Sequence, residues 1–120
     1  MSARPIVHIE IPSADHEATE KFYSELFGWK FETAGPPYNY TMFQAGNTGG
    51  GLMPPEQAKP GEIYLYIHSD DIEADVERIK AAGGEIEGER MDIPEMGSLI
   101  MFKDPTGNKI CLWKSAHPQE

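Results

Sequence analysis

Two stretches of the chain show the same order of predicted elements, and this repetition constrains the fold more strongly than any other feature. In each stretch an alternating run of apolar and polar residues, 5–11 or 62–68, is followed by a helical pattern that stops at glycine. The stopping glycines Gly28 and Gly84 lie 56 positions apart. This spacing predicts an internal repeat, and therefore two similar modules in tandem.

Module one, about residues 5–54, is predicted to contain one helix and four strands. The helix covers about residues 15–27, where Ala18, Phe22 and Leu26 recur at i, i+4 and i+8 and form an apolar stripe. Gly28 suits its end, because glycine adopts left-handed geometry without steric cost. The strands are expected over residues 5–11, 29–33, 38–45 and 48–53, and the glycines of the last one suit a close approach between strands.

Module two, about residues 62–114, repeats this order. Asp70 with Glu73 resembles a capping box and predicts the start of the second helix. The apolar stripe of that helix consists of Ile72, Val76 and Ile79. Residues 104–107, DPTG, have the preferences of a type I turn, so the last two strands are expected to form a hairpin. The strands of this module are expected over residues 62–68, 85–93, 98–102 and 108–113.

A proline-rich segment, about residues 54–61, is predicted to link the modules within a single domain, residues 1–120. The expected fold class is α+β, with two βαβββ modules that form a cup-shaped mixed sheet under two covering helices. Strand alternation places one set of apolar side chains under the helices and leaves the other faces to line the cup. The strand residues expected under the helices are Val7, Ile9, Ile11, Leu65, Ile67, Ile110 and Leu112. They are expected to pack against the helix residues Phe22, Leu26, Val76 and Ile79.

The charge of the chain argues against some partners. Acidic residues number 20 against 10 basic ones, and the formal charge of −10 repels nucleic-acid phosphates and anionic lipid head groups. No run reaches the roughly 20 apolar residues that span a bilayer, and the N-terminal residues lack the apolar core of a signal peptide. A single cysteine cannot form an intrachain disulfide. We therefore expect a cytoplasmic protein that binds neither nucleic acid nor membranes, while a cationic ligand stays compatible with the charge.

Three segments together resemble the vicinal oxygen chelate superfamily, which includes glyoxalase I, bleomycin-resistance proteins, fosfomycin-resistance enzymes and extradiol dioxygenases. The segments are HIEIPSADHEATEKFYSELFGWKF, IYLYIHSDDIEADVERIKAAGGEI and MFKDPTGNKICLW. The resemblance implies paired βαβββ modules around a cup, and assembly as a homodimer. In metal-dependent members the cup holds a divalent ion whose open positions accept neighbouring oxygens of the substrate.

The resemblance also places the family's metal-ligand positions on this sequence, and most of them lack a ligand. His8 falls on the first position, Tyr64 falls where a second histidine is usual, and Cys111 falls where a glutamate is usual. The remaining position falls near Gly50 or Gly51, which have no side chain. We therefore predict no resident cofactor, with His8 as the single candidate metal ligand and a divalent metal as the alternative.

The candidate ligand-binding residues are those that alternation turns toward the cup. Their imidazole, carboxylate, phenol, thiol and indole groups can hydrogen-bond to a small organic molecule or stack on it. They are His8, Glu10, Tyr64, Tyr66, Cys111 and Trp113. An alternative metal site joins His8 and Glu10 with His68, and Cys111 is alternatively a small thiol that only packs.

The predicted function is to bind a small organic molecule in the cup, with the usual metal-ligand set largely missing. Two alternatives stay open. One is a metal-dependent lyase or dioxygenase of the glyoxalase I or extradiol type with atypical ligands, and the other is a regulatory or interaction module with a vestigial cup. If the protein is an enzyme, the resemblance favours a glyoxalase-like lyase or a dioxygenase-like oxidoreductase, but no catalytic residue is assigned.

Overall fold

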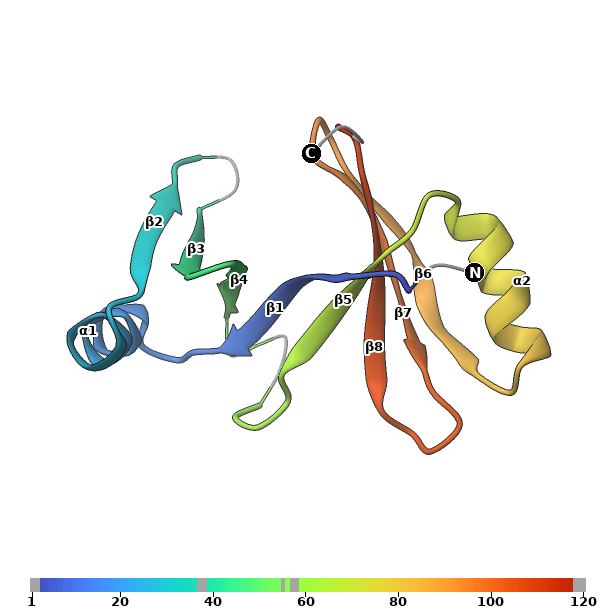
Figure 1. Cartoon of the computed structure of the whole chain (residues 1–120), viewed down its shortest axis with the longest axis horizontal. Helices are drawn as coiled ribbons and strands as arrows, with labels where there is room; N and C mark the ends of the chain where they lie inside the picture. The colour runs from blue at the N-terminus through green and yellow to red at the C-terminus, as the bar shows by residue number, and fades with distance from the viewer. Residues whose placement is uncertain (1–2, 37–38, 55, 57–58, 118–120) are drawn as a thin grey trace. The chain divides into compact units, whose positions relative to one another are not determined.

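The computed structural model describes residues 3–36, 39–54, 56 and 59–117, and the chain divides into two compact units. The first unit runs from His8 to Tyr64. The second unit combines the N-terminal segment up to Val7 with the chain from Leu65 onward. Each unit consists of a sheet and one α-helix (Figure 1). Neither helix in the described part of the chain is long and apolar enough to cross a membrane.

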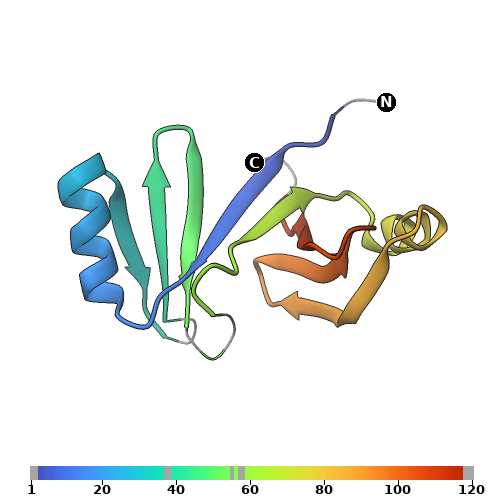
Figure 2. The same cartoon turned by 90° about the horizontal axis from the view of Figure 1, so that it is seen from below.

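The first unit builds its sheet from strands that lie side by side in the order β2-β3-β4-β1. Strands β1 and β4 are parallel, whereas β2–β3 and β3–β4 are antiparallel, and α1 lies beside β2 (Figure 2). The first two residues of β1 belong to the second unit. In chain order the elements are β1 (Ile6–Pro12), α1 (His16–Phe27), β2 (Lys30–Ala34), β3 (Tyr40–Ala45) and β4 (Thr48–Met53).

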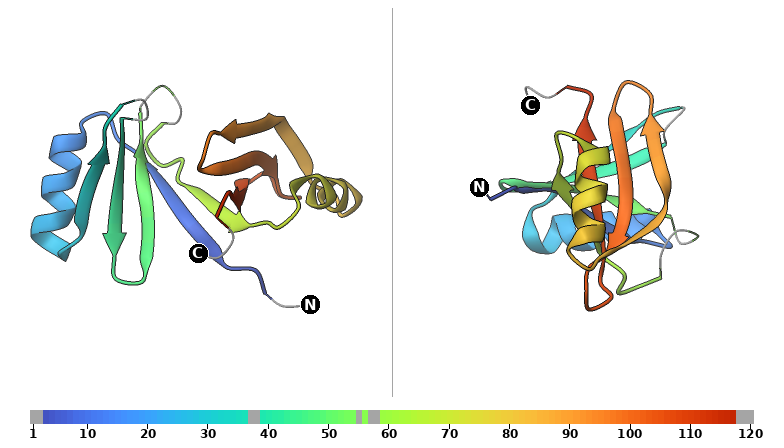
Figure 3. Two further views of the ribbon diagram at one scale, coloured as in Figure 1. Left: turned by 90° about the horizontal axis from the view of Figure 1, so that it is seen from above. Right: turned by 90° about the vertical axis from the view of Figure 1, so that its right-hand side faces the viewer.

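The second unit repeats this pattern with the order β5-β8-β7-β6. Here β5 and β8 are parallel, β8–β7 and β7–β6 are antiparallel, and α2 lies over one face of these strands (Figure 3). The elements are β5 (Tyr64–His68), α2 (Ile72–Ala81), β6 (Glu85–Ile93), β7 (Gly97–Lys103) and β8 (Lys109–Ser115).

The shared chain order and pairing confirm the α+β class and the two βαβββ modules. The predicted strands match the observed ones to within two residues at each end. The strand expected from residue 38 begins at Tyr40, and residue 38 itself lies outside the described residues. The boundaries of the single domain, its modules and its linker stay a prediction.

Helix α1 begins and ends as the sequence predicts, but it turns a different face to its sheet. Asp15 caps its start, and Gly28 ends it with a φ of 73°. On the packing face Tyr23 stacks on Trp29 with ring centroids 4.5 Å apart, and Trp29 stacks on Phe43 at 4.6 Å. This aromatic stack fixes the rotation of the helix about its axis.

Two predicted core residues of α1 are therefore exposed. Phe22 and Leu26 are 53% and 61% exposed, and the prediction that they pack against the sheet is wrong. Phe22 precedes Tyr23 by one position, which is about 100° around a helix, so the two side chains cannot both face the sheet. Val7 is also wrong as a core residue, at 40% exposed, because β1 pairs with β4 only from Ile9 onward.

Helix α2 starts one residue later than the capping box predicts. Asp71, rather than Asp70, is the N-cap, and its carboxylate accepts a hydrogen bond from the backbone N–H of Ala74 at 3.1 Å. Asp70 instead lies 2.8 Å from His68 Nε2. The cap falls on Asp71 because the backbone there is extended, with φ −153°, immediately before the first helical residue.

The core of the second unit lies between α2 and its sheet. Ile72 of the helix packs with Ile100 and Leu112, and these residues are at most 5% exposed. Four residues predicted for the packing between helices and sheets therefore belong to this core or pack against it: Leu112, Ile67, Val76 and Ile79. Leu65 and Ile110, which were predicted there too, are also half-buried but are not part of this cluster. The half-buried residues around the core are Ile67, Val76, Ile79, Ile86 and Phe102.

The hairpin between β7 and β8 forms as predicted. The backbone N–H of Gly107 donates to the carbonyl of Asp104 at 2.9 Å, which closes the turn. The Asp104 carboxylate accepts hydrogen bonds from the backbone N–H groups of Asn108 and Thr106 at 2.9 and 3.0 Å. These hydrogen bonds, above all those from Asn108, lower the pKa of Asp104 to about 2.

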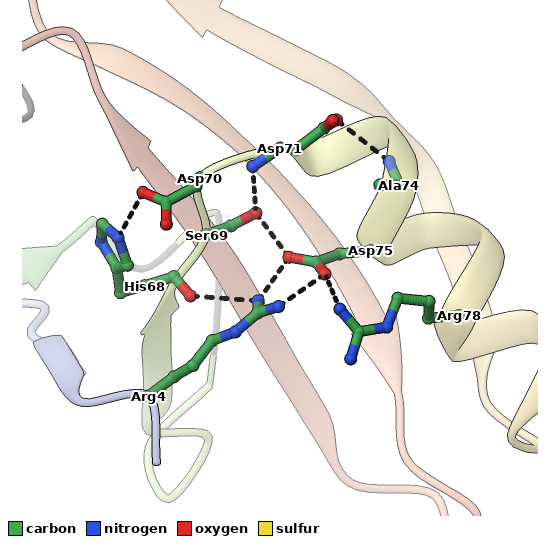
Figure 4. A network of polar contacts seen from close by, with 8 residues as sticks. All are labelled: Arg4, His68, Ser69, Asp70, Asp71, Ala74, Asp75 and Arg78. Carbon is green, nitrogen blue, oxygen red and sulfur yellow. Dashed lines mark hydrogen bonds and ion pairs between the residues drawn. The ribbon is translucent and has the colours of Figure 1, made fainter. Parts of the chain in front are cut away.

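Arg4 fastens the N-terminal segment to α2 within the second unit (Figure 4). Its guanidinium donates to both carboxylate oxygens of Asp75, at 2.5 and 2.9 Å, and the Ser69 hydroxyl donates to the same group at 2.6 Å. Asp75 is only 6% exposed, so this buried charge is paired and hydrogen-bonded. The hydrogen bond from Arg4 is the main cause that lowers the pKa of Asp75.

Candidate functional site

The six candidate ligand-binding residues are divided between the two units. His8, Glu10 and Tyr64 belong to the first, and the other three belong to the second. Phe43 in the first unit and Leu112 in the second lie on the sheet face that the helix covers. Strand alternation turns the candidate residues to the opposite face of each sheet. The three in the second unit are Tyr66, Cys111 and Trp113.

In the second unit the candidates form a closely packed row. Tyr66 is the register partner of Cys111 and is 7% exposed, while Cys111 is fully buried. A thiol hidden from solvent behaves as a small apolar group, which supports the packing alternative for Cys111. The indole of Trp113 lies beside Gly97, where an added Cβ would come within 2.7 Å of the ring atom Cζ2.

In the first unit a polar cluster joins His8, Glu10 and Tyr40 from strands β1 and β3. The Tyr40 hydroxyl donates to Glu10 Oε2. His8 Nε2 lies 2.8 Å from Tyr40 Oη and 3.7 Å from Glu10 Oε2. The side chains of His8 and Glu10 are 27% and 12% exposed, so a nearly buried carboxylate is connected through a phenol to an imidazole that solvent reaches.

Gly51 makes this cluster possible. Because β4 lies between β3 and β1, the Tyr40 side chain must pass over β4 to reach Glu10. A Cβ on residue 51 would lie 1.9 Å from Tyr40 Oη, far inside contact distance. On the other face of the strand, a Cβ on Gly50 would lie 1.9 Å from the carbonyl oxygen of Ile9. The glycine run therefore allows the close approach that the sequence predicts. The Tyr40 side chain comes close to Gly51, and the backbone of β1 comes close to Gly50.

The cluster fixes the positions of its protons. Burial raises the pKa of Tyr40 above its ordinary value of 10.0, and the charge and hydrogen bond of Glu10 raise it further. Tyr40 therefore stays protonated and donates its proton to Glu10. Its oxygen then accepts a hydrogen bond from His8, which places a proton on Nε2 of the imidazole.

Tyr40 is the residue of this cluster that the sequence analysis missed. Its position depends on the register between β3 and β4, which the two-residue turn at Gly46-Asn47 sets by pairing Ala45 with Thr48. This register places Met42 opposite Gly51 and Tyr40 one diagonal step away on the same face. In the sequence, the signal for Tyr40 is an aromatic residue that lies diagonally across a predicted hairpin from a glycine, here Gly51.

Among the contacts of the described residues, none links His68 to His8 or Glu10. It belongs to the second unit, where its Nε2 lies 2.8 Å from Asp70 Oδ1. The alternative site of two histidines and one carboxylate therefore gains no support from the contacts within either unit.

A surface groove of about 410 Å³ lies in the second unit, and none of the six predicted residues is among the residues that line it. Arg90 lines it and donates to Asp92 and Ser98, each at 3.0 Å, and it also pairs with Glu73 of α2. These contacts tie α2 to β6 and β7, so Arg90 has a structural role. The groove lining also includes Ile93, Gly97, Lys114, Ser115 and Ala116.

Comparison with known proteins identifies the family. Residues 5–112 match the family model of the Glyoxalase/Bleomycin resistance protein/Dioxygenase superfamily. The chain belongs to this superfamily. This confirms the resemblance on which the sequence analysis relied, over nearly the same range of residues.

Individual members of the superfamily differ in how much of their length this chain matches. A glyoxylase-like domain-containing protein of Didymella fabae is 34% identical over 112 residues, which cover 83% of this chain and 85% of that protein. CFP32 of Mycobacterium bovis, named as a candidate glyoxylase, is 28% identical over 89% of this chain. This chain spans less than half of the length of CFP32, 44%.

A solved structure supports the fold assignment. Methylmalonyl-CoA epimerase from Mycobacterium tuberculosis superposes with a TM-score of 0.73 and 17% identity, covering 92% of this chain and 87% of that one. At this identity the similarity shows a shared fold, and nothing about a shared substrate.

The cluster offers one imidazole and one carboxylate to a divalent metal ion, fewer than the three protein ligands of a typical catalytic zinc site. Catalytic zinc sites keep an open position beside their protein ligands. Within the residues that the structure describes, no three His, Cys, Asp or Glu side chains come together as a metal site. The phenol of Tyr40 lies between His8 and Glu10. By the resemblance, the family's remaining ligand position falls near Gly50 or Gly51, and neither residue has a side chain. The cluster is built for hydrogen bonding.

Proposed function

We propose that the protein binds a small organic molecule at the polar cluster of His8, Tyr40 and Glu10. The observation that carries this proposal is the nearly buried carboxylate of Glu10, linked through Tyr40 to an imidazole that solvent reaches, on the sheet face opposite the one that α1 covers. Buried polar groups arranged in this way orient a ligand and provide specificity. Membership of a superfamily named for glyoxalases, bleomycin-resistance proteins and dioxygenases supports a small-molecule ligand.

A ligand screen by two-dimensional NMR of the ¹⁵N-labelled protein tests this proposal. Compounds that shift the resonances of residues 8, 10 and 40 are titrated against wild type, His8→Ala and Tyr40→Phe. We expect each variant to weaken binding at least tenfold, because one polar contact or its partner is lost. His16→Ala on α1 is the matched control, since it removes an imidazole of the same unit outside the cluster, and it should bind as wild type does. Ligands that bind equally well to all four proteins would contradict the proposal.

We also propose that this binding needs no resident metal. Neutral Tyr40 is a poor ligand, and two donors alone bind a divalent ion too weakly to hold it through purification. Elemental analysis of untagged protein should give less than one Zn²⁺, Ni²⁺, Mn²⁺ or Fe²⁺ per chain. One tightly held ion per chain that disappears in His8→Ala would overturn this and favour a metal-dependent lyase or dioxygenase.

A further inference from the structure

The surface groove of the second unit lies at one end of three neighbouring strands. Its lining residues come from the last part of β6, the start of β7 and the end of β8. The backbone N–H of Ala116 donates to the carbonyl of Met96 at 2.9 Å, so the end of β8 lies beside the turn between β6 and β7 (Figure 1). The lining belongs to the second unit, whereas His8, Tyr40 and Glu10 belong to the first. A ligand in the groove would therefore use none of the residues of the polar cluster.

Opposite charges stand at the two ends of one row of residues in this groove. Ser98 pairs with Asp92 on one side and with Lys114 on the other, and residues directly opposite each other in antiparallel strands share a face of the sheet. The Cα atoms of Asp92 and Lys114 are therefore two strand spacings apart, which is about 10 Å. All three residues line the groove. The row thus presents a carboxylate and an ammonium group on either side of a serine.

Hydrogen bonds fix the carboxylate end of this row. Asp92 Oδ1 accepts from Arg90 Nε at 3.0 Å and from the Ser98 hydroxyl at 2.6 Å. Arg90 Nη2 donates to the same serine oxygen at 3.0 Å. Within the described part of the chain, both hydrogen bonds to the Asp92 side chain end on Oδ1, and this side chain is 73% exposed. Its second oxygen, Oδ2, can therefore accept a hydrogen bond from a ligand.

The two cations of the groove differ in their partners. Arg90 pairs with Glu73 and Asp92, whereas no ion pair or hydrogen bond joins the Lys114 side chain to another residue in the ranges that the structure describes. The charges of Arg90 and Lys114 balance those of Asp92 and Glu73. An anion or a cation alone would gain one attraction in the row and meet one like charge, whereas a ligand with both charges would gain two attractions.

We propose that the groove binds a small extended zwitterion, with its protonated amine at Asp92 and its carboxylate at Lys114. The width of the row requires several bonds between the two charges, as in an ω-amino acid or a short peptide. Ile93 and Ala116 also line the groove and offer apolar surface to the chain between the charges. Because ion pairs between exposed groups are weak, we expect dissociation constants in the millimolar range. This site is additional to the proposed function and does not depend on it.

Four small molecules test the inference. In 6-aminohexanoate the two charges are far apart, in glycine they are close together, and hexanoate and hexylamine carry one each. Each is titrated into ¹⁵N-labelled protein at pH 7 and constant ionic strength, and the shifts of residues 92, 98 and 114 give the dissociation constants. We expect 6-aminohexanoate to bind at least about threefold more tightly than each of the other three. Hexylamine that binds as tightly as 6-aminohexanoate would overturn the inference, because general attraction to the acidic surface would then explain the binding.

Variants assign each charge of the ligand to its partner. Lys114→Gln should make the dissociation constants of 6-aminohexanoate and hexylamine equal, because the carboxylate then gains nothing. Asp92→Asn keeps an acceptor for Arg90 and should make those of 6-aminohexanoate and hexanoate equal. Lys109→Gln is the matched control, since it removes the same charge from the other end of β8 and does not line the groove, and it should keep the preference for 6-aminohexanoate.

The outcomes keep this inference apart from the proposed function. Retention of the preference in Lys114→Gln, or its loss in Lys109→Gln, would overturn the inference. The absence of shifts at residues 92, 98 and 114 with all four molecules would overturn it too. None of these results changes the test of the proposed function, which is read at residues 8, 10 and 40 of the other unit.

Discussion

Residue 51 is a glycine, and its lack of a side chain has a large effect on the candidate site. It lets Tyr40 reach across β4 to Glu10, at a position where a Cβ would lie 1.9 Å from the phenol oxygen and 2.2 Å from the ring carbon Cζ. Residue 51 and Tyr40 therefore depend on each other: a side chain at one position excludes the aromatic ring at the other. The cluster of His8, Tyr40 and Glu10 exists because both residues have their present identity.

Gly51→Ala should displace Tyr40 and destabilise the protein. Overpacking of this kind typically costs about 1–3 kcal/mol, and the displaced phenol would also lose its hydrogen bonds to Glu10 and His8. Gly49→Ala is the matched control, because its Cβ would lie 3.3 Å from the flexible end of Gln44, and its free energy of unfolding should stay within about 1 kcal/mol of wild type. Urea denaturation measures both, and equal midpoints for the two variants would contradict the assigned role of Gly51.

The sequence predicts part of this site for a clear physical reason. Strand alternation is local, so the order of residues in β1 is enough to assign His8 and Glu10 to one face of that strand. Tyr40 joins them only through the register of β3, β4 and β1, which depends on two strand pairings. Its role therefore lies beyond a strand-by-strand analysis of the sequence.

At the scale of elements, local signals place the helices and strands well, but they do not set the rotation of a helix. The glycine that ends α1 and the turn at Asp104 are local features, and the structure confirms both. The rotation of α1 depends on the stack of Tyr23 on Trp29 and Phe43, which involves three parts of the chain. An apolar stripe that includes Phe22 is an equally good helical pattern, and nothing in the pattern itself rejects it.

The N-cap of α2 gives a second prediction. Asp71→Ala should lower the free energy of unfolding by about 1 kcal/mol, because the backbone N–H of Ala74 loses its acceptor at the start of the helix. Asp70→Ala is the neighbouring control and should cost less, because the side chain of Asp70 is 86% exposed where it contacts His68. Chemical denaturation of both variants at pH 7 distinguishes them, and a larger loss for Asp70→Ala would restore the cap predicted from the sequence.

The ion pair between Arg4 and Asp75 should make the stability of the protein depend on acid pH. Hydrogen bonds from Arg4 lower the pKa of Asp75 in the folded state, so the pair contributes its full stability above the unfolded pKa of 3.8 and loses it as the pH falls through the lower folded value. Arg4→Ala should cost about 1–3 kcal/mol at pH 7, since hydrogen bonds to a charged group are lost. The difference from wild type should shrink below pH 4.

Urea denaturation at pH 7 and pH 3 measures this effect. Arg78→Ala is a suitable control, because Arg78 lies farther from Asp75, at 3.5 Å, and its side chain is 56% exposed. Its cost at pH 7 should be smaller than that of Arg4→Ala. A cost of Arg4→Ala that is unchanged between the two pH values would show that the arginine acts through packing of its stem alone.

At the scale of the whole molecule, the resemblance to the vicinal oxygen chelate superfamily implies a homodimer, and helix α1 offers a surface for it. Phe22, Leu26 and Phe27 are 53–63% exposed, and the rings of the two phenylalanines lie 6.3 Å apart. Lys21 and Glu25 border this patch one helical turn apart. In a two-fold contact between antiparallel copies of α1, each lysine can face the glutamate of the other copy, since a two-fold interface is self-complementary.

We therefore predict a homodimer that buries the α1 patch of Phe22, Leu26 and Phe27. Light scattering coupled to size-exclusion chromatography at micromolar concentration should give twice the chain mass of 13.4 kDa for wild type. Leu26→Glu should shift the mass toward that of a monomer, because the interface would then bury two uncompensated carboxylates, one from each copy. Met91→Glu introduces the same charge at another exposed apolar residue, 57% exposed in the second unit, and should remain dimeric. A monomeric wild type would reject the dimer, whereas a dimer that persists in Leu26→Glu and dissociates in Met91→Glu would move the interface from α1 to β6.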